Sequence, residues 1–167
     1  MGLKSLLKKL KKSNYFIEWS KSNPDNFFSY AFKTIENDKE SPWQFGFYHK
    51  STDKMTTFIL ENNSVEIQEE EEIFKKPDMK VMPIDIKKIK MPFEKILKKA
   101  EELQKNEYPK ELISKTIAIL QNLEEYATIW NITYVTQSFK TLNIKVNPEN
   151  GKIISHDLES LMSLIKK

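Results

Sequence analysis

Two stretches of the sequence decide the fold, "TIENDKESPWQFGFYHKSTDKMTTFILENNSVEI" at residues 34–67 and "ILQNLEEYATIWNITYVTQSFKTLNIKVNPENGKII" at residues 119–154. In each, a Trp opens an alternating run, a polar turn leads to a second alternating run, and an Asn-containing turn leads to a short apolar strand. Alternation with a period of two is typical of strands that bury one face. The two stretches therefore predict two antiparallel meanders and an internal duplication.

The alternation also predicts which side chains face the core. Trp43, Phe45 and Phe47 share one parity in the first half, and Trp130, Ile132 and Tyr134 share the corresponding parity in the second. Large apolar side chains at one parity are usually sheet core. The opposite parity is expected to be more exposed, and if the sheet binds a partner we expect the contacts at Gln44, Tyr48, Asn131 and Thr133. Gly46, inside a strand, is expected at a bulge or a close backbone approach.

Helical periodicity precedes both meanders. "MPFEKILKKAEELQKN" places Phe93, Ile96, Leu97, Ala100 and Leu103 on one face, and the shorter "NYFIEWSKS" precedes the first meander. Three prolines between the halves argue against a helix there and favour an extended connector, with "IDIKKIK" as a candidate edge strand. Leu158, Leu161, Met162 and Ile165 have helical spacing and predict a closing helix.

The amino-terminal segment is basic and amphipathic. Residues 1–12 carry five Lys and no acid, whereas residues 13–167 carry 22 Lys and 24 acids. A leucine stripe faces one way and ends at Ser13, where a helix break is expected. The stripe could dock on the protein's own sheet, on a second subunit of a homodimer, or on an anionic membrane surface. The residues that would form a membrane or partner contact are Leu3, Lys4, Leu6, Leu7, Lys8, Leu10 and Lys11.

Composition excludes several kinds of chemistry. The 167 residues contain no Cys, so disulfides, thiolate nucleophiles and Cys-ligated zinc are excluded. The chain also has no Arg, which weakens any case for specific nucleic-acid recognition. His49 and His156 are expected to be surface histidines, and Glu69–Glu72 a solvated charge run, because neither set has the spacing of a metal site or a triad. We therefore expect no catalytic, cofactor-binding or metal-binding residues and no enzymatic activity.

The stretch from "MPFEKILKKAEELQ" to "NPENGKIISHDL" resembles a PepSY domain. In that family a helix precedes an antiparallel sheet, an aromatic-led strand precedes an apolar strand, and a turn with Asn or Asp and Gly closes the unit. The matching elements are "FEKILKKA", "WNITYV" and "LNIKVNPENGKII", within residues 92–156. The resemblance implies a small module that binds peptides or proteins and brings no catalytic residues. Family members often restrain proteases outside the cell, whereas this sequence shows no export signal.

The expected architecture is α+β, with two tandem PepSY/cystatin-like units, each a helix plus an antiparallel meander, packed as one body. Its parts are a basic amphipathic helix at 1–12, a first repeat at 13–75, a Pro-containing connector at 76–91 and a second repeat at 92–167. The expected function is non-enzymatic binding of a peptide or protein partner in the cytoplasm. The alternative is a peripheral protein held at the inner membrane surface by its opening helix.

Overall fold

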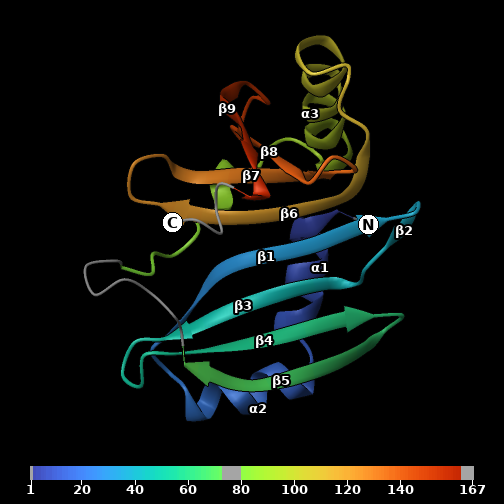
Figure 1. The fold of residues 1–167 in the computed structure, drawn as a ribbon. Coiled ribbons are helices and arrows are strands. Elements are labelled where there is room, and N and C mark those ends of the chain that lie inside the picture. Colours follow the sequence, from blue (N-terminus) through green and yellow to red (C-terminus); the bar gives the residue numbers. More distant parts are fainter. Residues whose placement is uncertain (1, 73–79, 163–167) are drawn as a thin grey trace.

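A single antiparallel sheet runs through the whole molecule (Figure 1). The computed structural model describes residues 2–72 and 80–162 of the chain, and of residues 69–72 it describes the backbone alone. The strand order is β5-β4-β3-β1-β6-β7-β8-β9, and the short β2 pairs with β1. The strands are β1 Asn26–Glu36, β2 Lys39–Glu40, β3 Trp43–His49, β4 Lys54–Glu61, β5 Ser64–Glu72, β6 Ile113–Leu123, β7 Ala127–Thr136, β8 Lys140–Val146 and β9 Ile153–Ser160.

The α-helices pack on one face of this sheet and share one core with it. They are α1 (Leu3–Lys11), α2 (Asn14–Ser22) and α3 (Phe93–Glu107). In Figure 1, α1 runs behind β1, β3 and β4. The expected break after α1 is confirmed, because Ser13 is the N-cap of α2 and its Oγ accepts a hydrogen bond from the Phe16 N–H at 3.2 Å. An α+β fold with an antiparallel sheet is therefore confirmed.

The two halves of the chain contribute similar sets of strands. Strands β1, β3, β4 and β5 form one four-stranded meander, β6 to β9 form another, and β1 pairs with β6 where they meet. Register shifts fall around Ser29 in β1 and around Ser114 in β6, at the same point of each meander. Trp43 lies opposite Leu60 on the next strand, as Trp130 lies opposite Val146.

The predicted core parity is confirmed. The side chains predicted to face inward are at most 8% exposed, and they pack with the buried faces of α1, α2 and α3. The aromatic rings of the two halves touch, since the ring centroids of Trp43 and Trp130 lie 6.0 Å apart. The halves therefore have a common core rather than two separate ones. The six predicted inward residues are Trp43, Phe45, Phe47, Trp130, Ile132 and Tyr134.

One predicted element is wrong, and a second is wrong at its start. The segment "IDIKKIK" forms no edge strand; it contains a short 3-10 helix, η1 (Ile86–Lys88), and Ile84 donates its N–H to the carbonyl of Phe28 at 3.0 Å. The predicted closing helix is wrong at its start, because Leu158 lies in strand β9, which pairs with β8, whereas Leu161 and Met162 are helical. A strand satisfies the otherwise free backbone groups of β8, and this outweighs the helical spacing of the leucines. Ile165, the last residue of that pattern, lies outside the described residues.

Gly46 is required by a close approach from the neighbouring strand. It lies opposite Tyr30, and a Cβ atom built on it would lie 1.9 Å from Tyr30 Cε1. We expect Gly46→Ala to displace the Tyr30 ring and to lower the free energy of unfolding by about 1–3 kcal/mol, as overpacking does. Urea denaturation measures this. Gly2→Ala is the control, because nothing lies within 4 Å of that position, and equal stabilities of the two variants would contradict the prediction.

Glu111 ties the start of β6 to the turn between β7 and β8. Hydrogen bonds from Lys140 Nζ at 2.9 Å and Ser138 Oγ at 2.8 Å lower the pKa of its carboxyl group. Because the pKa of Glu111 is lower in the folded state than in the unfolded chain, this contact stabilises the fold at pH values above the ordinary glutamate pKa of about 4.3. The stabilisation is lost as the pH falls through the pKa of Glu111 in the folded state.

We therefore expect Glu111→Gln to lower the melting temperature at pH 7 and to approach the parent chain in acid. Thermal unfolding between pH 7 and pH 3 measures this difference. Glu102→Gln, at an exposed position on α3, is the control and should track the parent chain throughout. If the melting temperature of Glu111→Gln stayed as far below that of the parent chain at pH 3 as at pH 7, the stabilising role of the ionised Glu111 would be contradicted.

Candidate functional site

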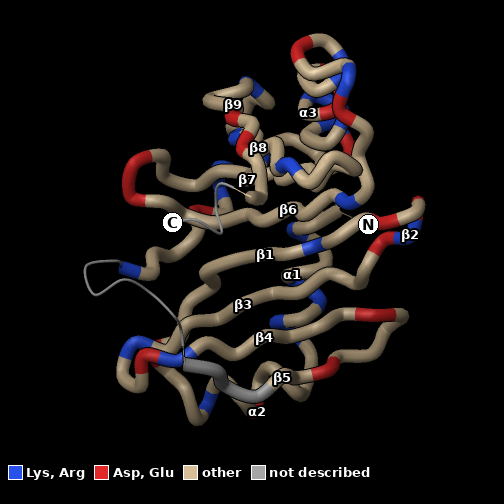
Figure 2. The backbone as a smooth tube through the Cα atoms, in the orientation of Figure 1, with Lys and Arg blue, Asp and Glu red and all other residues tan. Residues whose placement is uncertain are grey.

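The face of the sheet opposite the helices carries the candidate site. This open face is formed by the parity that alternates with the core residues, including Phe32, Gln44, Ile119, Asn131 and Thr133. Charged residues gather at turns, helices and strand ends, and the middle of the sheet carries few of them (Figure 2). The open face is therefore largely uncharged and partly apolar at its centre.

A cavity of about 480 Å³ lies on the open face. It spans β1, β3, β4 and β6, so both halves of the chain contribute to it, and residues 80–82 form one side. Gln44, Gln121 and Asn122 bring side-chain amides to this largely apolar lining. The principal apolar lining residues are Tyr30, Phe32, Met55, Met82, Ile119 and Leu123.

Hydrogen bonds fix the walls of the cavity. The Tyr30 hydroxyl bonds to Thr57 Oγ1, so the ring is held across Gly46. Ser29 Oγ donates to the Gly46 carbonyl at 3.3 Å and lies 3.1 Å from Met55 Sδ. These bonds anchor the floor of the cavity to the β1–β3 register shift.

The segment that follows residues 80–82 is tied to the ends of the central strands. Asn122 Nδ2 donates to the Pro83 carbonyl at 2.9 Å, and the Asp85 N–H donates to Thr128 Oγ1 at 3.2 Å. Ile84, between these two contacts, is buried in the core on the other side of the sheet. The connector thus passes the ends of β1 and β6, and its preceding residues form the wall of the cavity.

A separate polar cluster occupies the open face of the second meander. Asn143 Nδ2 donates to Asn131 Oδ1 and, at 2.9 Å, to Thr133 Oγ1. Lys145 Nζ donates to Asn143 Oδ1 at 2.7 Å and lies 5.6 Å from the Tyr126 ring centroid. These side chains satisfy one another across β7 and β8, so the cluster is a hydrogen-bonded polar surface.

The residues predicted for sheet-face binding fall in three places. Gln44 lines the cavity, whereas Asn131 and Thr133 belong to the polar cluster. Tyr48 was predicted to be more exposed, and this is wrong, since only 7% of it is exposed. Its ring packs edge-on against Phe27 with centroids 5.3 Å apart, and its hydroxyl bonds to Asp53. Neighbours from β1 and from the turn after β3, which the strand pattern does not reveal, account for this burial.

His49 is not the surface histidine predicted from the sequence. It is completely buried at the end of β3, with Nε2 3.0 Å from Thr56 Oγ1 and its ring centroid 4.8 Å from that of Trp19. His49 has the same parity in β3 as the inward-facing Trp43, Phe45 and Phe47, so the alternation of the sequence could have predicted that it is buried. His156 is exposed as predicted, and its Nδ1 lies 2.6 Å from the Tyr108 hydroxyl.

The leucine stripe of α1 is directed into the protein's own core. Leu3, Leu7 and Leu10 are at most 8% exposed, and Leu6 packs partly buried against the same core. The lysines predicted for a membrane or partner contact, Lys4, Lys8 and Lys11, are exposed. Of the three docking alternatives for the stripe, the structure has the one on the protein's own sheet, which leaves the lysines accessible.

Sequence reasoning missed the cavity itself. Its lining comes from β1, β3 and β4 in one half, β6 in the other, and the connector between them. The strands alone have the pattern of ordinary sheet and residues 80–82 that of a connector, and only the β1–β6 pairing brings them together. Among residues 2–72 and 80–162, no group of three or more His, Asp or Glu is placed to hold a metal ion. No helix in those ranges has the length and apolarity needed to cross a membrane.

Comparisons with known proteins identify a fold relative. No protein-family model matches the sequence, and no curated protein matches it. Among solved structures, the chain is similar to the crystal structure of a "putative lipoprotein" from Clostridium difficile 630. The TM-score is 0.55 with 12% sequence identity, over 87% of this chain and 91% of that one. At this identity the likeness concerns the fold alone.

Proposed function

We propose that this chain is a non-enzymatic binding module that holds an apolar side chain of a peptide or protein partner in the open-face cavity. The observation that carries the proposal is the cavity itself. Its volume of about 480 Å³ falls within the range of ordinary ligand sites, about 300–1,000 Å³, and its lining is mostly apolar with a few amides. Such amides could orient a peptide backbone while the apolar residues receive a side chain.

The lining also suits a partner with varied side chains. Met55 and Met82 face the cavity, and methionine side chains adapt their shape to different apolar groups. Lys80 and Glu124 are opposite charges within the same lining, so neither strongly acidic nor strongly basic partners are favoured. A leucine or phenylalanine side chain within an uncharged peptide segment is the occupant that fits best.

We further propose that the chain consists of two tandem PepSY-like units. The order of helix then four-stranded meander in both halves supports this, as do the corresponding register shifts at Ser29 and Ser114. In this interpretation the proposed binding cavity lies at the junction of the two units. A peptide-binding role agrees with what the resemblance implies, and cytoplasmic residence remains part of the proposal.

The proposal is tested with N-acetyl-phenylalaninamide and N-acetyl-leucinamide in 15N NMR titrations of the full chain. We expect saturable shifts of the side-chain amides of Gln44, Gln121 and Asn122, because these line the cavity. The side-chain amides of Asn131 and Asn143 should stay unshifted, because they lie in the polar cluster. Affinities in the millimolar range are expected for such small probes.

A pair of variants checks that the cavity is the site. Ile119→Lys places a charge in the cavity and should abolish the shifts, whereas Ile117→Lys, on the same face of β6 but outside the lining, should preserve them. The proposal fails if the probes leave the cavity amides unmoved, or if both lysine variants respond like the parent chain.

The exposed lysines of α1 favour a second candidate function at an anionic membrane surface. Lys4, Lys8 and Lys11 lie on the outer side of a helix whose leucines are buried, so adsorption would be electrostatic, about 1 kcal/mol per lysine. We expect flotation with anionic vesicles at low salt and its loss at high salt.

The flotation control uses charge removal rather than truncation, because deleting α1 would expose the core. Replacing Lys4, Lys8 and Lys11 together by Gln should abolish flotation while leaving the melting temperature close to that of the parent chain. Neutral vesicles should not carry either protein. Flotation that persists in high salt, or in the triple variant, would contradict adsorption through these lysines.

A further inference from the structure

A second cavity lies on the helical face of the sheet, away from the open-face cavity. It has a volume of about 490 Å³ and is bounded by α1, the first turn of α3 and the strands β1, β3 and β7. Leu3 and Leu6 of α1 form one wall, and Leu97 of α3 forms part of the opposite one. The helices therefore leave a gap between them above the centre of the sheet.

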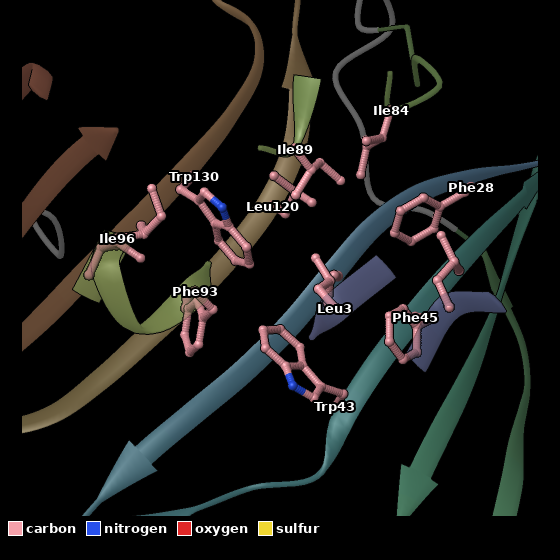
Figure 3. Close-up of a cluster of buried hydrophobic side chains, with 14 of the residues drawn as sticks. Leu3, Phe28, Trp43, Phe45, Ile84, Ile89, Phe93, Ile96, Leu120 and Trp130 are labelled. Carbon is pink, nitrogen blue, oxygen red and sulfur yellow. The ribbon is translucent and has the colours of Figure 1, made fainter. Parts of the chain in front are cut away.

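Aromatic rings form the floor of this second cavity (Figure 3). The ring centroid of Phe93 lies 4.9 Å from that of Trp43 and 5.0 Å from that of Trp130. These three rings and Leu3 come together in the close-up from two strands, β3 and β7, and two helices, α1 and α3. They are mutually packed and at most 9% exposed, which gives the cavity a fixed, apolar base.

Lys33 brings a mostly buried positive charge to this apolar surface. Its side chain projects from β1, is only 12% exposed, and places Nζ 4.9 Å from the Trp43 ring centroid. Glu40 Oε2 pairs with this Nζ at 2.5 Å, and the glutamate side chain is 55% exposed. A lysine side chain with so little exposed surface requires an anionic partner. Here the partner is the half-exposed Glu40, which another anion could replace.

Charged residues of both signs border the cavity. Lys4 and Lys90 border it in addition to Lys33, against Glu40 and Glu94, so lysines outnumber glutamates among the lining residues. Lys90 is also paired with Glu149, at 2.7 Å. With that outer pair set aside, Lys4 and Lys33 balance Glu40 and Glu94, so the attraction for an anion comes from the position of Lys33 beside the aromatic floor.

We infer that this cavity binds an amphiphilic carboxylate, that is, a carboxylate head joined to an apolar tail. The head would bond to Lys33 Nζ in competition with Glu40, and the tail would lie on Trp43, Phe93 and Trp130 between α1 and α3. Charge-assisted hydrogen bonds to a partly buried lysine are stronger than neutral ones, and apolar contact with the rings adds burial. The site does not depend on the open-face cavity.

The experiment titrates dodecanoate, below its micellar concentration, into the full chain and follows tryptophan fluorescence. A Trp19→Phe background leaves Trp43 and Trp130, both in the cavity lining, as the tryptophan reporters. We expect saturable binding of dodecanoate and weaker binding of the uncharged dodecanol. Lys33→Gln should weaken dodecanoate binding about tenfold, the effect of losing a hydrogen bond to a charged group, and should leave dodecanol binding nearly unchanged.

Glu40→Gln provides the decisive variant because its expected effect has the opposite sign. Removing the negative charge of Glu40, which competes for Lys33, should strengthen dodecanoate binding severalfold. A general loosening of the fold would not strengthen the binding of the charged probe alone. Lys21→Gln, in an exposed pair with Glu18 on α2, is the matched control and should change nothing. If Lys33→Gln fails to fold, as circular dichroism would show, Glu40→Gln still tests the inference.

The inference is overturned if dodecanoate and dodecanol bind equally well and neither responds to Lys33→Gln, or if Glu40→Gln fails to strengthen dodecanoate binding.

NMR distinguishes binding in this cavity from binding in the open-face cavity. Dodecanoate should leave the side-chain amides of Gln44 and Gln121 unshifted, since they line the other cavity. Shifts confined to those amides would place the probe on the open face and contradict the inferred site.

Discussion

The pairing of β1 with β6 is the interaction on which the rest of the structure depends. It runs from Tyr30 opposite Gln121 to Glu36 opposite Lys115 and makes one sheet from two four-stranded meanders. Small isolated sheets are marginally stable, and the join lets both bury a shared set of side chains. It also brings Trp43 and Trp130 together above the join, so the two halves share aromatic packing as well as backbone hydrogen bonds.

A joined sheet with helices on one side has two faces of different character. On the helical face, the gap between α1 and α3 leaves an aromatic floor with a buried lysine beside it. On the open face, the same central strands carry apolar and amide side chains with little charge. Alternation along β1 produces both, since Phe32 faces one cavity and Lys33 the other. One strand thus supplies the chemistry of two distinct surfaces.

Much of the fold could be predicted because the sequence pattern and the tertiary structure agree. The inward parity of β3 and β7 and the break at Ser13 follow from local spacing and capping. The end of strand β9 could not be predicted from the helical spacing that begins at Leu158, because the need to pair the free edge of β8 decided it. The burial of Tyr48 could not be predicted for a similar reason, since it depends on Phe27 of β1 and on Asp53 in a turn, whereas the burial of His49 follows from the inward parity of β3. Gln44 was identified correctly as a residue of the open face, but the cavity around it needs the β1–β6 pairing.

The opening helix links the fold to the helical-face cavity. Its leucines belong to the core, so the basic amphipathic pattern that resembles a membrane-binding segment is first of all a folding pattern. The same docking places Leu3 and Leu6 in the wall of the cavity and Lys4 at its border. In the second half, α3 is one continuous helix, whereas the first half has α1 and α2 divided at Ser13, so the two helical layers cannot match across the sheet. The cavity with the aromatic floor lies between α1 and α3. The two meanders are similar, but the helices that cover them are not, and the cavity lies where these different helices meet.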